Sequence, residues 1–472
     1  MKKFILTAVI GVLLTQACFA QNVSDPKSLQ ITVYNANFGL VKDTRQIDLE
    51  KGIVSLNIED VASTIDPTSV LFKPLTNPES VLILEQNYQY DLINPNNILS
   101  KLVGERVWFD DNKSGILLNP PANGGMVVRM DDGKLVMDPK INSVAKMPDG
   151  LHPIPTLNWL LQSSKTGKEQ VEISYLANGI SWSADYVVLV NKDDTKLDMS
   201  GWVTLSNQTG TSFKDAKLTL MAGDVRRIQP VGRGGAYGAE MAMDAVSFAA
   251  PQFTEKSFFE YHIYQMERKT TIANKETKQL SLLNANGVPV TKELIYDARK
   301  EWFRGWWYPG VNYYPTEGYD TSNYHKVNVV LVAINSKSNN MGMPLPKGKI
   351  RVYKLDDDGS QQFIGEDQID HTPKDEKIRL YVGDAFDVVG DYKRTNFRKI
   401  SDNIVEESFE VKIRNHKTSL VNVRVVEHAF SDWSVTAASH KWQKNDATTL
   451  EFPVTVQPDK EVIVTYTILT KW

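Results

Sequence analysis

The chain is poor in the residues that most metal and redox sites use. It has 472 residues with a single cysteine, Cys18, and seven histidines. One cysteine cannot form an internal disulfide, and zinc sites built on cysteine pairs are excluded. The histidines show no metal-ligand spacing, and the sequence has no H-E-x-x-H, no G-x-S-x-G and no phosphate-binding glycine loop. We therefore expect no metal and no cofactor, and we assign no catalytic residue.

Excess basic charge and long apolar runs are also missing. The formal net charge is -4 at pH 7, with 53 basic and 57 acidic residues. Binding to nucleic acid needs a basic surface, so this charge argues against a nucleic-acid partner. Beyond the first twenty residues no segment is long and apolar enough for a membrane-spanning helix, so we expect no transmembrane span in the mature chain.

The first twenty residues have the pattern of an export signal. A pair of lysines is followed by an apolar core at residues 4–14 and then by small residues. This pattern predicts cleavage between Ala20 and Gln21 and a location in the periplasm or at the cell surface. The alternative is a lipid anchor on Cys18, for which the preceding LTQA is a poor match to the usual motif.

What the chain has in abundance is short strands separated by turns. In LQITVYNANFGLVKDTRQIDLEKGIVSLNIEDV, β-branched residues alternate with polar ones. GGMVVRMDDGKLVMD predicts a hairpin that turns at Asp131–Gly133. LDDDGS at residues 355–360 is interpreted as a hairpin turn, because its spacing does not fit a calcium loop. NNILSKLVG predicts one short helix. We expect an all-β protein with two β-sandwich-like domains and few short helices.

The length of the chain and the positions of its turn-forming glycine and proline residues suggest several domains and linkers. The expected parts are a signal peptide at 1–20, an N-terminal β domain at 21–150, a hinge at 151–164 with a helical turn at LNWLL, and a C-terminal β-sandwich domain at 165–472. The last part contains a mobile linker at 230–252 and an aromatic-rich insertion at 284–325. Within it, GDAFDVVGDYKR carries three aspartates that could hold a cation or an amine. We expect them to be solvated charges in a turn.

The aromatic insertion contains WFRGWWYPGVNYYPTEGY, where large rings stand among turn-forming residues. Two interpretations remain open. The rings either cover an apolar patch of the sandwich or stay exposed and bind a sugar or a protein. We expect most rings to pack, and those at 306–308 to be exposed between Gly305 and Pro309. The candidate binding residues are Trp302, Trp306, Trp307, Tyr308, Tyr313 and Tyr314, and Phe303 is a further ring of the same segment.

Several separated stretches together resemble a known family. YNANFGLVKDTRQIDLEKGIVSLNIEDVASTIDPTSVLFKPL resembles the opening of a large bacterial family of exported proteins. GISWSADYVVLV, KLTLMAGDV, MPLPKGKIRVYKLDDDGSQQFIGED and LEFPVTVQPDKEVIVTYTI resemble its C-terminal domain, known as domain of unknown function 4139. That domain is similar to the C-terminal half of the mucoidy inhibitor A-like proteins. Unlike those proteins, this chain has no long charged heptad region. The resemblance implies an exported, β-rich protein and brings no catalytic residue.

From these observations we expect a non-catalytic binding or scaffolding protein of the cell envelope that uses loops such as the aromatic insertion. The expected partner is an envelope glycan or an envelope protein, and the oligomeric state stays open. The alternative is an envelope hydrolase, with a glycosidase- or peptidase-like site assembled from distant strands. A pair of carboxylates about 5–10 Å apart in an aromatic groove would favour a glycosidase.

Overall fold

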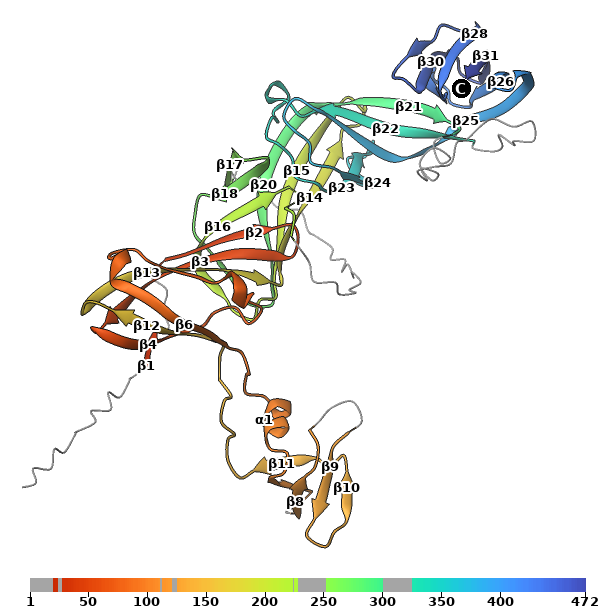
Figure 1. Ribbon diagram of the computed structural model, residues 1–472. Coiled ribbons are helices and arrows are strands. Elements are labelled where there is room, and N and C mark those ends of the chain that lie inside the picture. Colours follow the sequence, from red (N-terminus) through yellow and green to blue (C-terminus); the bar gives the residue numbers. More distant parts are fainter. Residues whose placement is uncertain are drawn as a thin grey trace, which may run out of the picture. The chain divides into compact units, whose positions relative to one another are not determined.

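The structure is a computed structural model that describes residues 20–23, 28–110, 113–120, 125–223, 225–227, 252–299 and 325–472. Strands dominate these residues (Figure 1). The described part contains one α-helix, α1 (Pro95–Lys101), and three short 3-10 helices, η1 (Pro67–Ser69), η2 (Pro78–Ser80) and η3 (Lys337–Asn339). The expected all-β, sandwich-like fold with few short helices is confirmed. No helix in this part is long and apolar enough to cross a membrane.

The chain divides into two compact units. Unit 1 comprises Met1–Trp182, Leu205–Val225 and Gln265–Lys278. Unit 2 comprises Ser183–Thr204, Arg226–Tyr264 and Gln279–Trp472. The chain passes from one unit to the other within strands β14 (Ile180–Val190), β15 (Lys196–Asn207), β18 (Tyr261–Met266) and β20 (Glu276–Pro289), and between Val225 and Arg226. Unit 1 therefore takes in strands beyond the expected N-terminal domain of residues 21–150.

Unit 1 is built on two sheets. One has the order β1–β4–β12–β6, and the other has the order β16–β2–β3–β13–β5, with β19 paired to β16. The bounds of the first are β1 (Ala20–Val23), β4 (Gly52–Glu59), β12 (Thr156–Ser163) and β6 (Val81–Gln89). The bounds of the second are β16 (Phe213–Ala222), β2 (Ser28–Tyr34), β3 (Phe38–Leu49), β13 (Gly167–Asn178), β5 (Leu71–Pro74) and β19 (Thr270–Ile272). Alternate residues are buried along β3 and β13, and the ring of Trp159 on β12 lies 5.2 Å from that of Phe72 on β5. The two sheets therefore pack face to face.

The expected helical turn at residues 157–161 was wrong. These residues form the middle of β12, which pairs with β4 on one side and β6 on the other. Leu157, Trp159 and Leu161 are fully buried and point to one face, as a period of two requires. A short apolar run fits a helical turn or a buried strand equally well by itself, and the pairing decides between them.

A small sheet with its own core lies between β6 and β12 in the sequence. Its order is β10 (Leu135–Met137), β9 (Val127–Met130), β8 (Lys113–Leu117), β7 (Arg106–Phe109) and β11 (Ile141–Val144). Helix α1 packs on it through Leu99, and Asn94 caps the helix by accepting the N–H of Asn97 at 2.9 Å. The expected hairpin at Asp131–Gly133 joins β9 to β10, and Gly133 has a φ of 85° that suits glycine.

Unit 2 contains a five-stranded and a nine-stranded sheet. The first has the order β20–β15–β14–β23–β24, with β23 (Gly348–Leu355) and β24 (Gln361–Ile369) joined by the expected LDDDGS turn. The second has the order β28–β31–β26–β25–β22–β21–β27–β30–β29. Its bounds are β28 (Asp432–Ala438), β31 (Lys460–Lys471), β26 (Ile404–Asn415), β25 (Lys377–Ser401), β22 (Lys326–Ile334), β21 (Thr291–Asp297), β27 (Val421–His428), β30 (Thr449–Val456) and β29 (Gln443–Lys444). Strands β17 (Phe253–Phe258) and β18 (Tyr261–Met266) are neighbours, and β18, whose last two residues belong to unit 1, is also a neighbour of β16.

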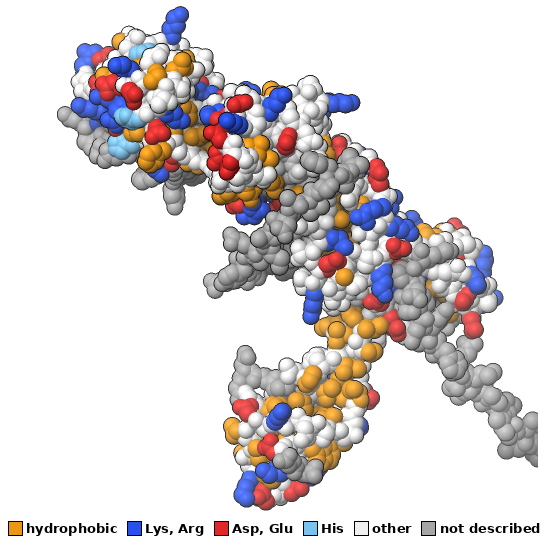
Figure 2. Space-filling model, turned by 180° about the vertical axis from the view of Figure 1, so that it is seen from behind, with side chains coloured by type: hydrophobic (Ala, Val, Ile, Leu, Met, Phe, Trp, Pro, Cys, Tyr) orange, Lys and Arg blue, Asp and Glu red, His pale blue; other side chains and the backbone are white. Residues whose placement is uncertain are grey.

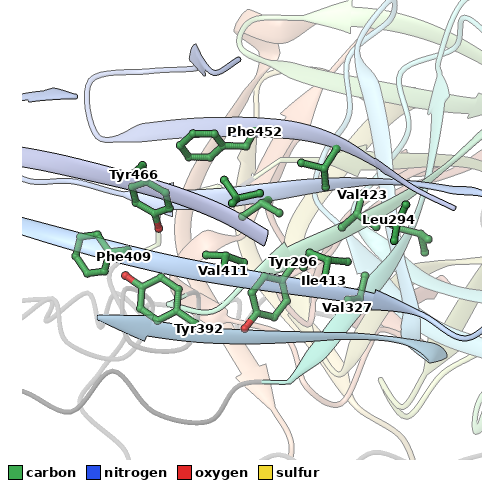
Figure 3. Packing of buried hydrophobic residues seen from close by; sticks show 14 of the residues in the cluster. Leu294, Tyr296, Val327, Tyr392, Phe409, Val411, Ile413, Val423, Phe452 and Tyr466 are labelled. Carbon is green, nitrogen blue, oxygen red and sulfur yellow. The ribbon is translucent and has the colours of Figure 1, made fainter. Parts of the chain in front are cut away.

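The main core of unit 2 is aromatic at one end and aliphatic at the other (Figure 3). The rings of Tyr392, Phe409, Tyr466 and Phe452 form a chain with centroid separations of 5.5, 5.4 and 4.8 Å. Leu294, Val327 and Val423 are labelled at the aliphatic end. On the surface that Figure 2 shows, acidic and basic side chains are interspersed, as the small net charge of the sequence predicts.

Three buried asparagines, Asn207, Asn335 and Asn415, mark a structural repeat. Each ends or directly follows the central strand of a trio: β14–β15–β20, β21–β22–β25 and β25–β26–β31. Each side-chain amide nitrogen donates to one carbonyl of the following loop and to two consecutive carbonyls of the turn before the outer strand, at 2.8–3.4 Å. The acceptors are Thr211, Ile272 and Ala273 for Asn207, Met343, Thr372 and Pro373 for Asn335, and Ser419, Val456 and Gln457 for Asn415.

Candidate functional site

The aromatic candidates of the insertion, Trp302, Phe303, Trp306, Trp307, Tyr308, Tyr313 and Tyr314, lie outside the described residues, and their role stays a prediction. The expected mobile linker at 230–252 lies outside them as well, except for Gln252. Ala20 and Gln21, on either side of the predicted cleavage point, are the first two residues of β1. Cleavage there would leave Gln21 as the first residue of a strand that pairs with β4.

Residues 284–297 of the expected insertion belong to strands β20 and β21, so we keep the name insertion for residues 300–324. The described residues on both sides of it contact the same stretch of β25. The N–H of Gly390 donates to the carbonyl of His325 at 2.9 Å, and Nδ1 of His325 lies 2.6 Å from a carboxylate oxygen of Asp391. On the other side, the guanidinium of Arg299 lies 3.5 Å from the hydroxyl of Tyr392. The insertion therefore begins and ends at one end of the β21–β22 pair.

A pocket opens on the nine-stranded sheet at that same end, and we call it the charged pocket. Its volume is about 390 Å³, and it is lined by Ile295, Asp297, Asn328, Val330, Asp367, Arg379, Tyr381, Arg424, Val426 and Glu451. Side chains alternate along a strand, so two faces result. Leu294 and Tyr296 on β21 point into the core of unit 2, whereas Ile295 and Asp297 point into the pocket. The core thus holds the sheet from behind while the pocket faces outward.

Strand register explains how distant residues meet in the charged pocket. Ile295 lies opposite Arg424 of β27 and opposite Asn328 of β22. Val426 lies between Asp297 and Glu451 in the next row across the sheet. Apolar side chains from β21, β22 and β27 therefore alternate with charged ones, and together they present both kinds of surface to a ligand.

The basic side chains of the pocket converge on one carboxylate. Arg379 stands on β25 and Arg424 on β27, with β22 and β21 between them, so the two strands are about 14 Å apart. Both guanidinium groups reach the same oxygen of Glu293 on β21, at 3.1 and 2.7 Å. The buried Nε of Arg424 has no hydrogen-bond acceptor within reach in the described part of the chain, and the nearest carboxylate oxygen, on Glu451, is 3.7 Å away.

The acidic side chains of the pocket are held differently. Asp297 accepts hydrogen bonds from Nε2 of His428 at 3.0 Å and from the N–H of Arg299 at 3.3 Å. Asp367, on β24, accepts the backbone N–H groups of Gln368 and Tyr381 at 2.8 and 2.7 Å. No ion pair joins Asp367 to a cation among the described residues. Each carboxylate is thus fixed in place by hydrogen bonds.

A buried network supports the pocket from the core side. Glu427 is fully buried next to His428, and its carboxylate accepts from Arg299 and Tyr392, both at 2.8 Å, and from Tyr466. Burial raises the pKa of both tyrosine hydroxyls well above its usual value, and the charge of Glu427 adds to the increase. The guanidinium of Arg299 is almost buried, so the network fixes the residue at which the insertion begins.

One local expectation from the sequence changes at this site. The aspartates of GDAFDVVGDYKR do not lie in a solvated turn, because they belong to the 25-residue strand β25. Asp384 accepts hydrogen bonds from Asn328 and Tyr381 at 2.8 and 2.9 Å and lies 3.1 Å from Lys326. No group of three or more His, Cys, Asp or Glu side chains in the described ranges could hold a metal ion.

Sequence reasoning missed the pocket itself. Its residues come from six strands, and Asp297 and His428 are 131 positions apart. Nothing in the local pattern of either segment indicates that they meet. The one usable signal was the density of aspartates in β25, which stands beside the pocket.

Comparison with known proteins adds no relative: no protein-family model matches the chain, and no curated protein matches it.

Proposed function

We propose that the protein is an exported, non-catalytic binding protein of the bacterial cell envelope, and that its ligand, part of an envelope glycan and the peptides attached to it, enters the charged pocket. The N-terminal export pattern and the resemblance to an exported family support the location. The arrangement of the pocket supports binding. Its polar groups are held by hydrogen bonds before a ligand arrives, which lowers the entropy cost of binding.

One observation carries this proposal. Two arginines, a tyrosine, an asparagine and three acids from six strands converge on one cavity of about 390 Å³, behind which the sheet is braced by a packed core. Ligand sites are commonly such cavities, with a few fixed polar groups among apolar ones. Structural ion pairs alone do not require a cavity.

The test is sedimentation of the mature protein, residues 21–472, with insoluble cell-wall sacculi. We expect binding that falls about tenfold or more in the double variant Arg379→Gln, Arg424→Gln, because charge-assisted hydrogen bonds are lost. Arg398→Gln is the matched control, since Arg398 is also on β25 and also pairs with a carboxylate, that of Glu406. Equal loss in the control, or no binding by the unchanged protein, refutes the proposal.

The predicted aromatic surface provides a second test of the same function. Substituting Trp306 and Trp307 by alanine is expected to weaken binding to sacculi while the melting temperature is retained. This expectation rests on the sequence, where rings stand in a turn-rich segment. Unfolding of the double variant without a separable binding defect would assign these rings to packing.

A second candidate is an envelope hydrolase, which one observation favours. Asp297 and His428, on two different strands, form a hydrogen-bonded pair at 3.0 Å, and Asp297 lines the charged pocket. A carboxylate that orients a histidine is a common arrangement for proton transfer. Mass spectrometry of soluble wall fragments incubated with the protein decides the matter. Cleavage products that disappear in His428→Gln support hydrolysis, and unchanged fragments exclude it.

Export has its own test. The intact mass of the protein recovered from the envelope is expected to correspond to a chain that begins at Gln21. A mass that shows a diacylglycerol on Cys18 would instead support a lipid anchor.

A further inference from the structure

The arginine side of the charged pocket has more hydrogen-bond donors than its acids accept, although Glu293 and Glu451 both lie within 4 Å of a guanidinium nitrogen. Arg379 and Arg424 share a single oxygen of Glu293. A guanidinium has five N–H donors, so two of them present far more donors than one carboxylate can accept. The buried Nε of Arg424 lacks a hydrogen-bond acceptor among the described residues. This side of the pocket therefore suits a further carboxylate, which arginine binds through two parallel hydrogen bonds.

The opposite charge stands on β24. The two oxygens of Asp367 each accept one backbone N–H, and each keeps a further lone pair. Because no cation in the described part of the chain pairs with Asp367, its negative charge is available to a ligand. Asp367 and Arg379 both line the pocket, but no ion pair within 4 Å joins them. Asp367 is bonded to the backbone of Tyr381, which lies two residues from Arg379 on β25.

Apolar side chains also line the pocket. Ile295, Val330 and Val426 come from β21, β22 and β27, which are adjacent strands. A ligand that carries two opposite charges and a short aliphatic part matches these groups. A neutral sugar would leave both charges unmatched, and a dianion would face Asp367 with a like charge.

We infer that the charged pocket takes a small zwitterion, namely an amino acid or a dipeptide end with a free ammonium and a free carboxylate. The carboxylate binds Arg379 and Arg424, and the ammonium binds Asp367. This inference rests on the proposed binding function and names its ligand class. A cavity of about 390 Å³ is near the lower end of ligand pockets, which agrees with a ligand of this size.

The experiment is calorimetric titration of the mature protein with alanyl-alanine as the probe. Three matched compounds accompany it: N-acetyl-alanyl-alanine lacks the ammonium, alanyl-alaninamide lacks the carboxylate, and N-acetylglucosamine lacks both. We expect the dipeptide to bind and each capped compound to bind about tenfold or more weakly, because one charge-assisted hydrogen bond is lost each time.

Two variants test which residue binds the ammonium and which binds the carboxylate of the ligand. The penalty of a cap is the loss of affinity of the capped compound relative to alanyl-alanine. Asp367→Asn is expected to remove most of the penalty of the acetyl cap, and Arg379→Gln most of the penalty of the amide cap. Each variant should leave the other penalty in place, as a double-mutant cycle requires. Arg398→Gln serves again as the control and should leave both penalties unchanged. Thermal unfolding of each variant shows whether the fold is retained.

The outcomes separate the inference from the function on which it rests. If capped and free dipeptides bind equally, or if only N-acetylglucosamine binds, the zwitterion assignment is wrong, even when sacculi are still bound through Arg379 and Arg424. If sacculi are not bound but the dipeptide is, the proposed envelope function fails and the ligand class stands.

Discussion

Replacement of Asn415 by alanine is the sharpest test of how the sandwich is held together. Asn415 is 1% exposed, and its amide nitrogen faces the carbonyls of Ser419, Val456 and Gln457 at 2.9, 3.1 and 3.2 Å. Its amide oxygen accepts the N–H of Lys417 at 3.0 Å. The side chain thus joins the loop that leads to β27 with the turn that leads to β31.

The magnitude follows from the donor count. An amide nitrogen has two hydrogens, so it fully makes two of the three bonds at a time, and the oxygen makes one more. Three net hydrogen bonds at about 1 kcal/mol each predict a loss of about 3 kcal/mol in the free energy of unfolding. For a unit of this size that lowers the melting temperature by roughly 6–12 °C.

The assay is differential scanning calorimetry, in which the two units are followed as separate transitions where they resolve. Asn415→Ala is expected to lower the transition of unit 2, and Asn207→Ala that of unit 1. Asn422→Ala is the control, because its side chain accepts a single exposed bond from Thr455. A loss below about 0.5 kcal/mol for Asn415→Ala, or an Asn415→Asp variant as stable as the original, would refute the reasoning.

Three further predictions concern unit 2. Glu427→Gln should lower the free energy of unfolding by about 3 kcal/mol in denaturant titration, since it removes the carboxylate charge that faces the buried guanidinium of Arg299; an effect near zero would show that the pair is dispensable. The raised pKa values of Tyr392 and Tyr466 mean that the folded chain keeps protons that the unfolded chain releases above about pH 10, so stability is full below that pH and declines above it; a free energy of unfolding that does not fall above that pH would contradict this. Phe386→Ser should change the free energy of unfolding by less than about 0.5 kcal/mol in the same titration, because the ring is 94% exposed, and a larger loss would mean that the ring packs.

The sequence by itself determined the features that depend on near neighbours. The hairpins at Asp131–Gly133 and at residues 355–360 and the short helix at 95–101 follow from turn residues, a capping asparagine and a proline at the helix start, all within a few positions of one another. Alternating β-branched residues likewise determined the all-β class.

Only the tertiary structure decided which strands meet. The run at 157–161 became a strand because β4 and β6, far away in the sequence, pair with it. The three asparagines recur at unequal intervals, so no fixed period reveals the repeat that their hydrogen bonds show. The charged pocket depends on the parallel pairing of β21 with β27, which sets Asp297 beside His428. Long-range strand pairing depends on how whole sheets pack, and the local sequence pattern of one strand does not identify its partner.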